Sequence, residues 1–209
     1  MKILIVDDHA VVRQGIKQII SEMDGPLQVA EAGNGSDAIR MLREGQWDMV
    51  LLDINLPGKN GIEILKQIKA EWKKLPVLML SMYSEEQYAM RAIRSGASGY
   101  MTKETAPDEL LNAINKVMHG GRYISAEVAE KLVFDQDEGG DELPHHLLSD
   151  REYEVLRRIA SGHTVSEIAE QLNLSVKTIS TYRSRILEKM KMKHNAELTH
   201  YAIKHELVE

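Results

Sequence analysis

Residues 49–58, Met-Val-Leu-Leu-Asp-Ile-Asn-Leu-Pro-Gly, contain a short apolar run that ends in an aspartate. The run 49–52 shows no alternation of polar and apolar residues, and neither does the run 2–6, Lys-Ile-Leu-Ile-Val. Uninterrupted apolar runs of this length are typical of strands that helices cover on both faces. Three further candidate strands have a similar length: 27–31, 76–80 and 98–101.

Longer patterns with helical periodicity separate these strands. The first of them places apolar residues at spacings of three and four, which gives a helix one apolar face: Val12, Ile16, Ile19, Ile20 and Met23. We expect helices at about 10–22, 35–45, 60–71, 84–95 and 106–118. Five strand–helix units in tandem predict an α/β fold, a doubly wound five-stranded parallel sheet with right-handed crossovers.

The sequence changes character after residue 118. His119-Gly120-Gly121 suits the end of a helix, and residues 125–134 could form one more short helix. Residues 135–144 are acidic and contain glycine, which is typical of a mobile linker. From residue 148 onward the pattern is helical, with helices expected at about 150–160, 165–172, 176–190 and 195–205. We therefore predict a first domain over 1–120, a short helix and acidic linker over 121–147, and a small all-α four-helix domain over 148–209.

The composition limits the cellular setting. Hydrophobic residues make up 43% and charged residues 28% of the chain, as in ordinary globular proteins. No apolar stretch approaches the roughly 20 residues of a membrane span, and the start is too soon acidic for a secretory signal. The chain has no cysteine, which rules out disulfides and thiolate metal sites and fits a reducing compartment. We expect a cytoplasmic protein that does not bind a membrane.

Polar residues follow the ends of four expected strands: Asp7 and Asp8, then Asp53, Ser81 and Lys103. In the strand order 2-1-3-4-5, the first and third strands are neighbours at the point where the order reverses, so the three aspartates would meet there. Two unit charges 4 Å apart repel by roughly 4 kcal/mol at an effective dielectric of 20, and a divalent cation relieves this. Clustered carboxylate and carbonyl oxygens suit Mg²⁺. A carboxylate beside Mg²⁺ can attack a phosphoryl group, whose charge a lysine and a hydroxyl complement.

Each of these aspartates also has a simpler interpretation. Asp7-Asp8 could cap the helix that follows, and Asp53 could take part in the turn at 55–58. The placement of polar residues at four strand ends together favours a shared site.

Four segments, IVDDH (5–9), LLDINLPGKNG (51–61), LMLS (78–81) and GYMTK (99–103), resemble the receiver domain of two-component response regulators over about residues 1–120. The resemblance implies that Asp53 is the phosphoacceptor and that Lys103 contacts the phosphoryl group. It also implies that Ser81 shifts toward this group on activation while Tyr100 turns inward. The implied Mg²⁺ ligands are Asp7, Asp8, Asp53 and the backbone carbonyl of Asn55. One departure is Lys103-Glu104, where many receivers have Lys-Pro and a cis proline that fixes the lysine.

A second candidate site lies near the carboxyl terminus. The net charge of −6 argues against nucleic-acid binding, yet residues 175–193 contain six basic residues against Glu188 alone. Residues 164–190 fit a helix-turn-helix, with the turn at Asn173-Leu174 and Ser175 as the cap of the second helix. That helix gathers Ile179, Tyr182, Ile186 and Met190 on one side, and Lys177, Thr181, Ser184 and Glu188 on the other. The alternative is an ordinary solvated helix in a small bundle.

Residues 148–190 resemble the four-helix DNA-binding domain of the LuxR type, and with the receiver they resemble the NarL/FixJ architecture. The resemblance implies base contacts from Ser180, Thr181 and Ser184. It implies phosphate contacts from Lys177, Thr178, Arg183, Arg185 and Lys189. The implied partners are double-stranded DNA, a sensor histidine kinase, RNA polymerase and a second copy of the chain, which would associate on phosphorylation or on DNA.

Two other functions fit parts of the sequence. A haloacid-dehalogenase phosphatase also uses Asp, Ser or Thr, Lys and Mg²⁺, but its nucleophile lies in an Asp-x-Asp motif, whereas the first strand here ends in Asp7-Asp8-His9. The second alternative function is that of a receiver domain used only for protein docking, with a carboxyl-terminal tail that binds protein. The phosphatase leaves the helix-turn-helix pattern unexplained, and absence of salt-sensitive DNA binding would favour the docking protein. We expect a transcription regulator and not an enzyme.

Overall fold

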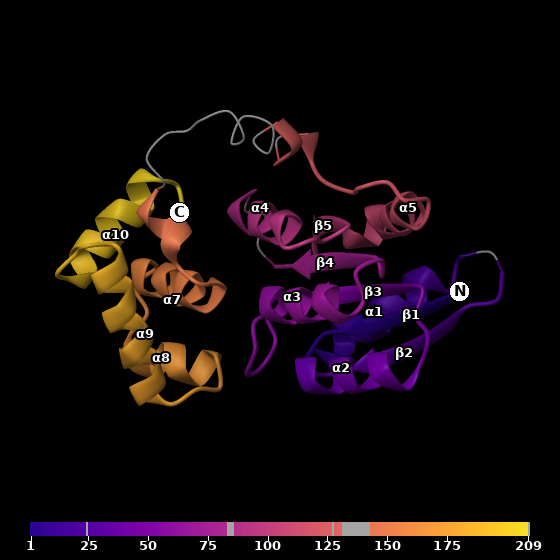
Figure 1. Ribbon diagram of the computed structural model, residues 1–209, viewed down its shortest axis with the longest axis horizontal. Coiled ribbons are helices and arrows are strands. Elements are labelled where there is room, and N and C mark those ends of the chain that lie inside the picture. Colours follow the sequence, from indigo (N-terminus) through magenta and orange to yellow (C-terminus); the bar gives the residue numbers. More distant parts are fainter. Residues whose placement is uncertain (24, 83–85, 127, 131–142, 209) are drawn as a thin grey trace. The chain divides into compact units, whose positions relative to one another are not determined.

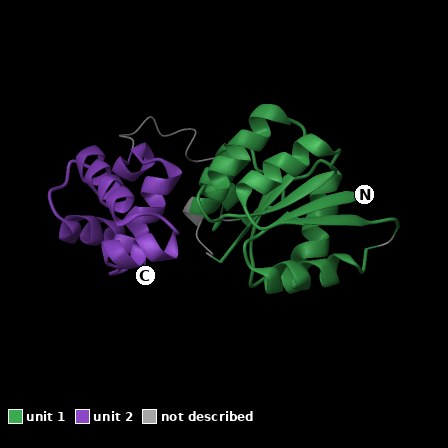
Figure 2. Cartoon of the chain, turned by 90° about the horizontal axis from the view of Figure 1, so that it is seen from below, with its two compact units in different colours: residues 1–138 green, residues 139–209 purple. Residues whose placement is uncertain are grey.

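The computed structural model describes residues 1–23, 25–82, 86–126, 128–130 and 143–208. The chain divides into two compact units, residues 1–138 and 139–209 (Figure 2). The acidic residues 135–142 of the predicted linker lie outside the described residues. Of the helix predicted at 125–134, residues 126 and 128–130 are helical and 131–134 lie outside the description. Among the described residues, no helix is long and apolar enough to cross a membrane.

The first unit contains a five-stranded parallel sheet in the order β2-β1-β3-β4-β5 (Figure 1). This confirms the predicted α/β fold. The strands are β1 (Lys2–Val6), β2 (Gln28–Ala32), β3 (Met49–Asp53), β4 (Val77–Ser81) and β5 (Gly99–Thr102). β3 and β4 are buried along their whole length, which explains why their sequences show no polar alternation.

Helices cover both faces of this sheet. They are α1 (Ala10–Ile20), α2 (Gly35–Glu44), α3 (Gly61–Glu71), α4 (Glu86–Arg94) and α5 (Ala106–Met118). Apolar residues of α1 and α5 pack together with Ile3, Met49 and Leu78 of the sheet in one core cluster. α2 contacts α3, and α3 contacts α4, in the layer on the other face.

The loop after β3 fixes the start of α3. The Gly61 N–H donates to the Ile54 carbonyl at 2.8 Å. Asn60 and Glu63 form a capping box, in which the Asn60 side chain accepts from the Ile62 N–H at 2.9 Å and Glu63 accepts from the Asn60 N–H at 3.2 Å. The loop that begins with Asp53 is therefore held by hydrogen bonds at its far end.

The second unit is all-helical, as predicted. Its elements are a 3₁₀ turn η1 (Pro144–Leu147), α7 (Asp150–Ala160), α8 (Val165–Gln171), α9 (Val176–Lys189) and α10 (Asn195–Lys204). Ser149, Thr164 and Ser175 cap α7, α8 and α9 with their side chains. α9 packs against α7 and α8 with one side, and its other side is exposed. α10 packs against α7.

We expect Gly61→Ala to destabilise the first unit by about 1–3 kcal/mol. A Cβ at this position would meet the Asp53 carbonyl oxygen and lie 2.7 Å from the Ile54 Cα, and both are backbone atoms that cannot easily move. Urea unfolding followed by tryptophan fluorescence measures this, because Trp47 and Trp72 both lie in the first unit. The control is Gly15→Ala, where a Cβ meets nothing within 4 Å. Equal stability of the two variants would contradict the expected clash.

Candidate functional site

The polar residues at the strand ends form one cluster. Asp7, Asp8, His9 and Asp53 each offer a ligand atom, and these atoms all lie within 4.8 Å of one another. Asp7 and Asp53 are fully buried, whereas the side chain of Asp8 is 34% exposed at the rim. The parallel strands β1 and β3 place Asp7 and Asp53 side by side, because Val6 pairs with Leu52 in the sheet.

Lys103 supplies the positive charge of this cluster. Its Nζ lies 2.6 Å from Asp7 Oδ2 and 2.8 Å from Asp53 Oδ2. The Lys103 N–H donates to the Ser81 carbonyl at 2.7 Å, so the end of β4 fixes the backbone that carries the lysine. The lysine is therefore held by its backbone although no proline follows it.

Burial raises the pKa of Asp53 to about 6. Lys103 opposes this rise and the nearby Asp7 carboxylate adds to it. Burial lowers the pKa of Lys103, but the two carboxylates outweigh it and hold that pKa above its ordinary value. The cluster thus contains a carboxylate whose negative charge is only partly compensated and a lysine that stays protonated at neutral pH.

The donor set fits a magnesium ion. Among the described residues, Asp53 Oδ1 and Asn55 Oδ1 are buried without a hydrogen-bond partner. Asp7 Oδ2 and Asp53 Oδ2 pair with the Lys103 ammonium. Hard carboxylate and amide oxygens that lack donors are the ligands that Mg²⁺ prefers.

The capping interpretation of Asp7 and Asp8 does not match the geometry. His9, not Asp7 or Asp8, is the cap residue of α1, and its side chain makes no capping bond. Asp7 Oδ1 accepts from the His9 N–H at 2.8 Å. Asp53 is the last residue of β3 and is buried, and the Asn55 backbone lowers its pKa, so its position fits both the shared site and the start of the turn.

His9 also belongs to the cluster, although it is not one of the predicted site residues. Its Nδ1 lies 2.8 Å from Asp8 Oδ1 and 3.4 Å from Asp7 Oδ1, with the side chain 66% exposed. Its position directly after two aspartates at a strand end was the available signal.

The two predicted switch residues lie beside the cluster. Ser81 is the last residue of β4 and is fully buried. Tyr100 lies in β5 and is 7% exposed. The movements predicted for both residues belong to the activated, phosphorylated state, and they stay predictions.

The second candidate site is the exposed face of α9. Ile179 and Ile186 are buried, while Lys177, Thr181 and Ser184 are exposed, together with Ser180 and Arg185. The Thr181 hydroxyl donates to the Lys177 carbonyl at 2.9 Å, and the Ser184 hydroxyl donates to the Ser180 carbonyl at 3.0 Å. Each hydroxyl oxygen keeps lone pairs that can accept a hydrogen bond from outside the helix.

Three residues with predicted phosphate contacts have partners inside the second unit. Arg183 Nε donates to Asn195 Oδ1 at 2.6 Å, and Lys189 Nζ lies 2.6 Å from Glu152 Oε2. The Thr178 hydroxyl lies 2.7 Å from the Ser175 hydroxyl. These contacts join distant parts of the chain or cap α9, so a DNA contact by these side chains would compete with them and stays a prediction.

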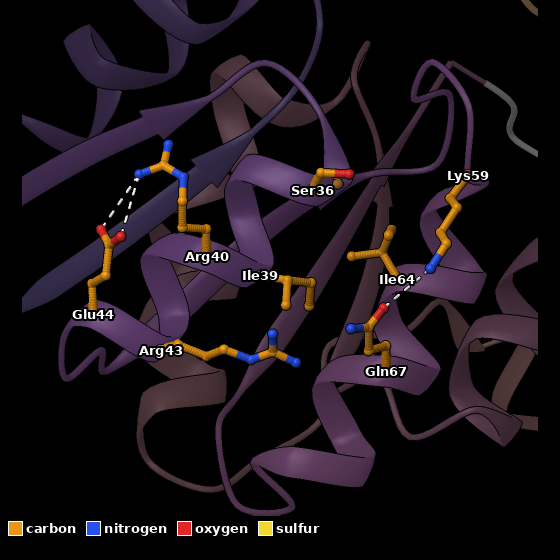
Figure 3. Close-up of a pocket in the computed structure, with 9 residues that line it drawn as sticks. Ser36, Ile39, Arg40, Arg43, Glu44, Lys59, Ile64 and Gln67 are labelled. Carbon is orange, nitrogen blue, oxygen red and sulfur yellow. Dashed lines mark hydrogen bonds and ion pairs between the residues drawn. The ribbon is translucent and has the colours of Figure 1, made fainter.

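A pocket of about 350 Å³ in the first unit lies between α2 and α3, and none of its lining residues belongs to the strand-end cluster (Figure 3). Its cationic side chains are already engaged: Arg40 with Glu44 at 3.4 Å, Lys59 with Gln67 at 3.4 Å, and Arg43 with Glu71 at 2.7 Å. Nothing in this lining points to a particular ligand.

The raised pKa of Asp53 predicts how stability depends on pH. An unfolded aspartate titrates near about 3.9, and the folded carboxyl titrates at about 6. Between these values the folded state binds more protons than the unfolded one, so the charged carboxylate lowers stability progressively and fully above the folded pKa. In EDTA, Asp53→Asn should therefore raise the free energy of unfolding at pH 7 by about 1–3 kcal/mol and change it little near pH 4.

The matched control for this measurement is Asp108→Asn. Asp108 is an exposed residue in the first turn of α5, and its neutralisation should give no comparable gain at pH 7. A gain for Asp53→Asn that is the same at both pH values would show that the carboxylate's charge is not its cause.

Comparison with known proteins accounts for both units. The family model described as "Response regulator receiver domain" matches residues 3–115, and the model described as "Bacterial regulatory proteins, luxR family" matches residues 146–202. Response regulator UvrY of Escherichia coli strain K12 is 38% identical over 208 residues, which are 99% of this chain and 95% of UvrY. Oxygen regulatory protein NreC of Staphylococcus carnosus is 35% identical over the full length of both chains.

Solved structures give the same result. The RcsB response regulator of Salmonella typhimurium has 27% sequence identity and a TM-score of 0.67, with 96% of each chain covered. RcsB bound to promoter rprA in the presence of the phosphomimetic BeF₃⁻ has 28% identity and a TM-score of 0.63, with 96% of this chain and 98% of that chain covered. The chain therefore belongs to the response regulators with a LuxR-type DNA-binding domain, which are two-component transcription regulators and not enzymes.

Proposed function

We propose that Mg²⁺-dependent phosphorylation of Asp53 by a sensor histidine kinase controls DNA binding by α9. The observation that carries this proposal is the contact of Lys103 Nζ with the buried carboxylates of Asp7 and Asp53 at 2.6 and 2.8 Å. A lysine held between two carboxylates is placed to neutralise a phosphoryl group added to either of them. Burial raises the pKa of Asp53, and its buried Oδ1 lies outside the ion pair with Lys103.

In the proposed transfer, an Asp53 carboxylate oxygen attacks the phosphorus of a phosphohistidine. The new O–P bond forms as the P–N bond breaks, and the imidazole leaves with the bonding electrons and takes up a proton. The residues that would hold Mg²⁺ are Asp7, Asp8, Asp53 and the backbone carbonyl of Asn55. When bound, Mg²⁺ supplies positive charge to the phosphoryl oxygens. Lys103 would then leave Asp53 and pair with the phosphoryl oxygens, which carry more negative charge than the carboxylate it faces now.

Ser81 and Tyr100 would register this change. The Ser81 hydroxyl lies at the end of the strand next to Asp53 and would donate to the phosphoryl group. Tyr100 pairs with Met79 in the neighbouring strand and would turn toward the space that Ser81 leaves. Movement of these two residues would change the surface formed by α4, β5 and α5.

The exposed face of α9 would enter the major groove of double-stranded DNA. Ser180, Thr181 and Ser184 would contact base edges, and the predicted basic residues and Thr178 would contact phosphates. A promoter complex and DNA-bound dimers are reported for RcsB. By analogy this chain would act in the cytoplasm as a homodimer, formed on phosphorylation or on DNA, and would contact RNA polymerase.

A small-molecule phosphodonor with Mg²⁺ should label the chain once, at Asp53. Intact-mass measurement should show one phosphoryl adduct, which is absent from Asp53→Asn and from samples in EDTA. Lys103→Ala should keep some labelling but lose the link between labelling and DNA affinity. Labelling of the Asn variant at the wild-type level would refute the assignment, and rapid multiple turnover of the phosphodonor would favour a phosphatase.

The exposed residues of α9 should separate into two functional groups. Lys177→Ala and Arg185→Ala should weaken binding to all DNA sequences and reduce the slope of log affinity against log salt by about one unit each. Thr181→Ala and Ser184→Ala should leave that slope unchanged and alter base preference by about 1–3 kcal/mol at one or two positions. Titrations at several salt concentrations against a randomised DNA library measure both effects. If the hydroxyl variants shift the slope and keep the base preference, α9 does not read bases as proposed.

A further inference from the structure

The chain that follows α5 returns to the edge of the sheet. Residues 121–125, here called the connector, begin after Gly120, whose φ of 81° turns the chain away from the helix. The Tyr123 backbone pairs with β5 at Gly99 in a parallel bridge. The Tyr100 N–H donates to the Tyr123 carbonyl at 2.8 Å, and the Tyr123 N–H donates to the Ser98 carbonyl at 3.1 Å. The connector is thus bonded to the strand that carries Tyr100.

The side chain of Tyr123 fastens the connector to α5 as well. Its hydroxyl donates to Glu109 Oε2 at 3.0 Å, and its ring packs against the core cluster between α1, α5 and the sheet. The Lys116 ammonium lies 5.9 Å from the ring centroid. Burial and the Glu109 carboxylate raise the pKa of Tyr123, so the hydroxyl keeps its proton and remains a donor.

Gly99 allows the close approach of the connector to β5. A Cβ at Gly99 would lie 2.8 Å from the Tyr123 carbonyl oxygen and 3.0 Å from the Tyr123 Cβ, so only glycine allows this close approach. A cavity of about 320 Å³ adjoins the contact, and both Tyr100 and Tyr123 line it together with Thr102, Glu109 and Val128. Backbone bonds, a side-chain bond and a shared cavity therefore join the same two tyrosines.

We propose that Tyr123 is a positioning residue that makes the connector move with β5 at Tyr100. The connector is the first covalent step from the receiver toward the DNA-binding unit. A change of β5 at Tyr100 would therefore shift the start of this link directly, through the hydrogen bond between the two backbones. This inference rests on the proposed function, in which Tyr100 responds to phosphorylation of Asp53.

Amide exchange in the unphosphorylated chain tests the contact itself. The Tyr100 and Tyr123 amides are donors in the same small ladder, so one opening event should expose both and their protection should be similar. Tyr123→Phe removes the bond to Glu109 and should speed exchange at both amides together, by about tenfold. Glu109→Ala should do the same, whereas Glu109→Gln keeps an acceptor and should restore protection. Exchange that changes at Tyr123 alone, or at neither amide, would overturn the proposal even in a chain that does not respond to phosphorylation.

DNA affinity with and without the phosphodonor tests the consequence. Tyr123→Phe and Gly99→Ala should take the Asp53 adduct in wild-type yield, but the gain in DNA affinity on labelling should fall by about tenfold. Gly15→Ala, at an exposed position of α1 with nothing within 4 Å of its Cβ, is the matched control and should keep the full gain. An undiminished gain in both variants would show that Tyr123 only anchors the connector. Failure of the wild type itself to gain affinity would count against the proposed function, while the exchange measurement still decides on the contact.

Discussion

The ion pair of Lys103 with two buried carboxylates is the interaction on which the rest of the receiver depends. Asp7 and Asp53 are fully buried, and burial of an unpaired carboxylate costs far more than a domain of this size can offset. The lysine can reach both only if β1, β3 and β5 end at the same edge with their observed registers. A slip of any of these strands would leave a charge buried without its partner. The strands therefore have to keep a single register, and the buried apolar runs of β3 and β4 help to fix it.

The same cluster is also an incomplete electrostatic arrangement, and that makes it suitable for a switch. Two buried carboxylates share one ammonium, and Asp8 adds a further carboxylate at the rim. Burial, with a contribution from Asp7, raises the pKa of Asp53. A divalent cation would restore the balance, and a phosphoryl group would disturb it again by bringing further negative charge to the position where Lys103 pairs now. The Lys103 backbone is hydrogen-bonded to Ser81, so a displacement of the lysine would also shift the end of β4 beside β5.

The parts of this structure that follow from local sequence were predictable, and the parts that follow from contacts between distant residues were not. Apolar runs and helical spacing located every strand, with ends that differ from those observed by about one residue. Strand order then placed Asp7, Asp53, Ser81 and Lys103 together. By contrast, the Lys189–Glu152 pair joins residues that are 37 positions apart, and no local pattern marks it. Charge counting therefore could not show that Lys189 and Arg183 also have partners within the second unit.

The engagement of these two residues changes how DNA binding by α9 should be understood. Lys177 and Arg185 are exposed cations on its polar face and lie next to hydroxyl side chains whose donors bond to the helix backbone. If Arg183 and Lys189 keep these partners on DNA, α9 makes fewer phosphate contacts, and its affinity is lower and falls less steeply with salt. Neutral hydroxyls add selectivity at small cost, since each can accept from a base edge without losing its own bond. A single DNA-binding unit with weak affinity gains most from any event that brings two such units together, because the second unit then binds at a high effective concentration. The modest charge of α9 is thus consistent with control through the receiver, since a more basic helix would bind DNA whether or not Asp53 carried a phosphoryl group.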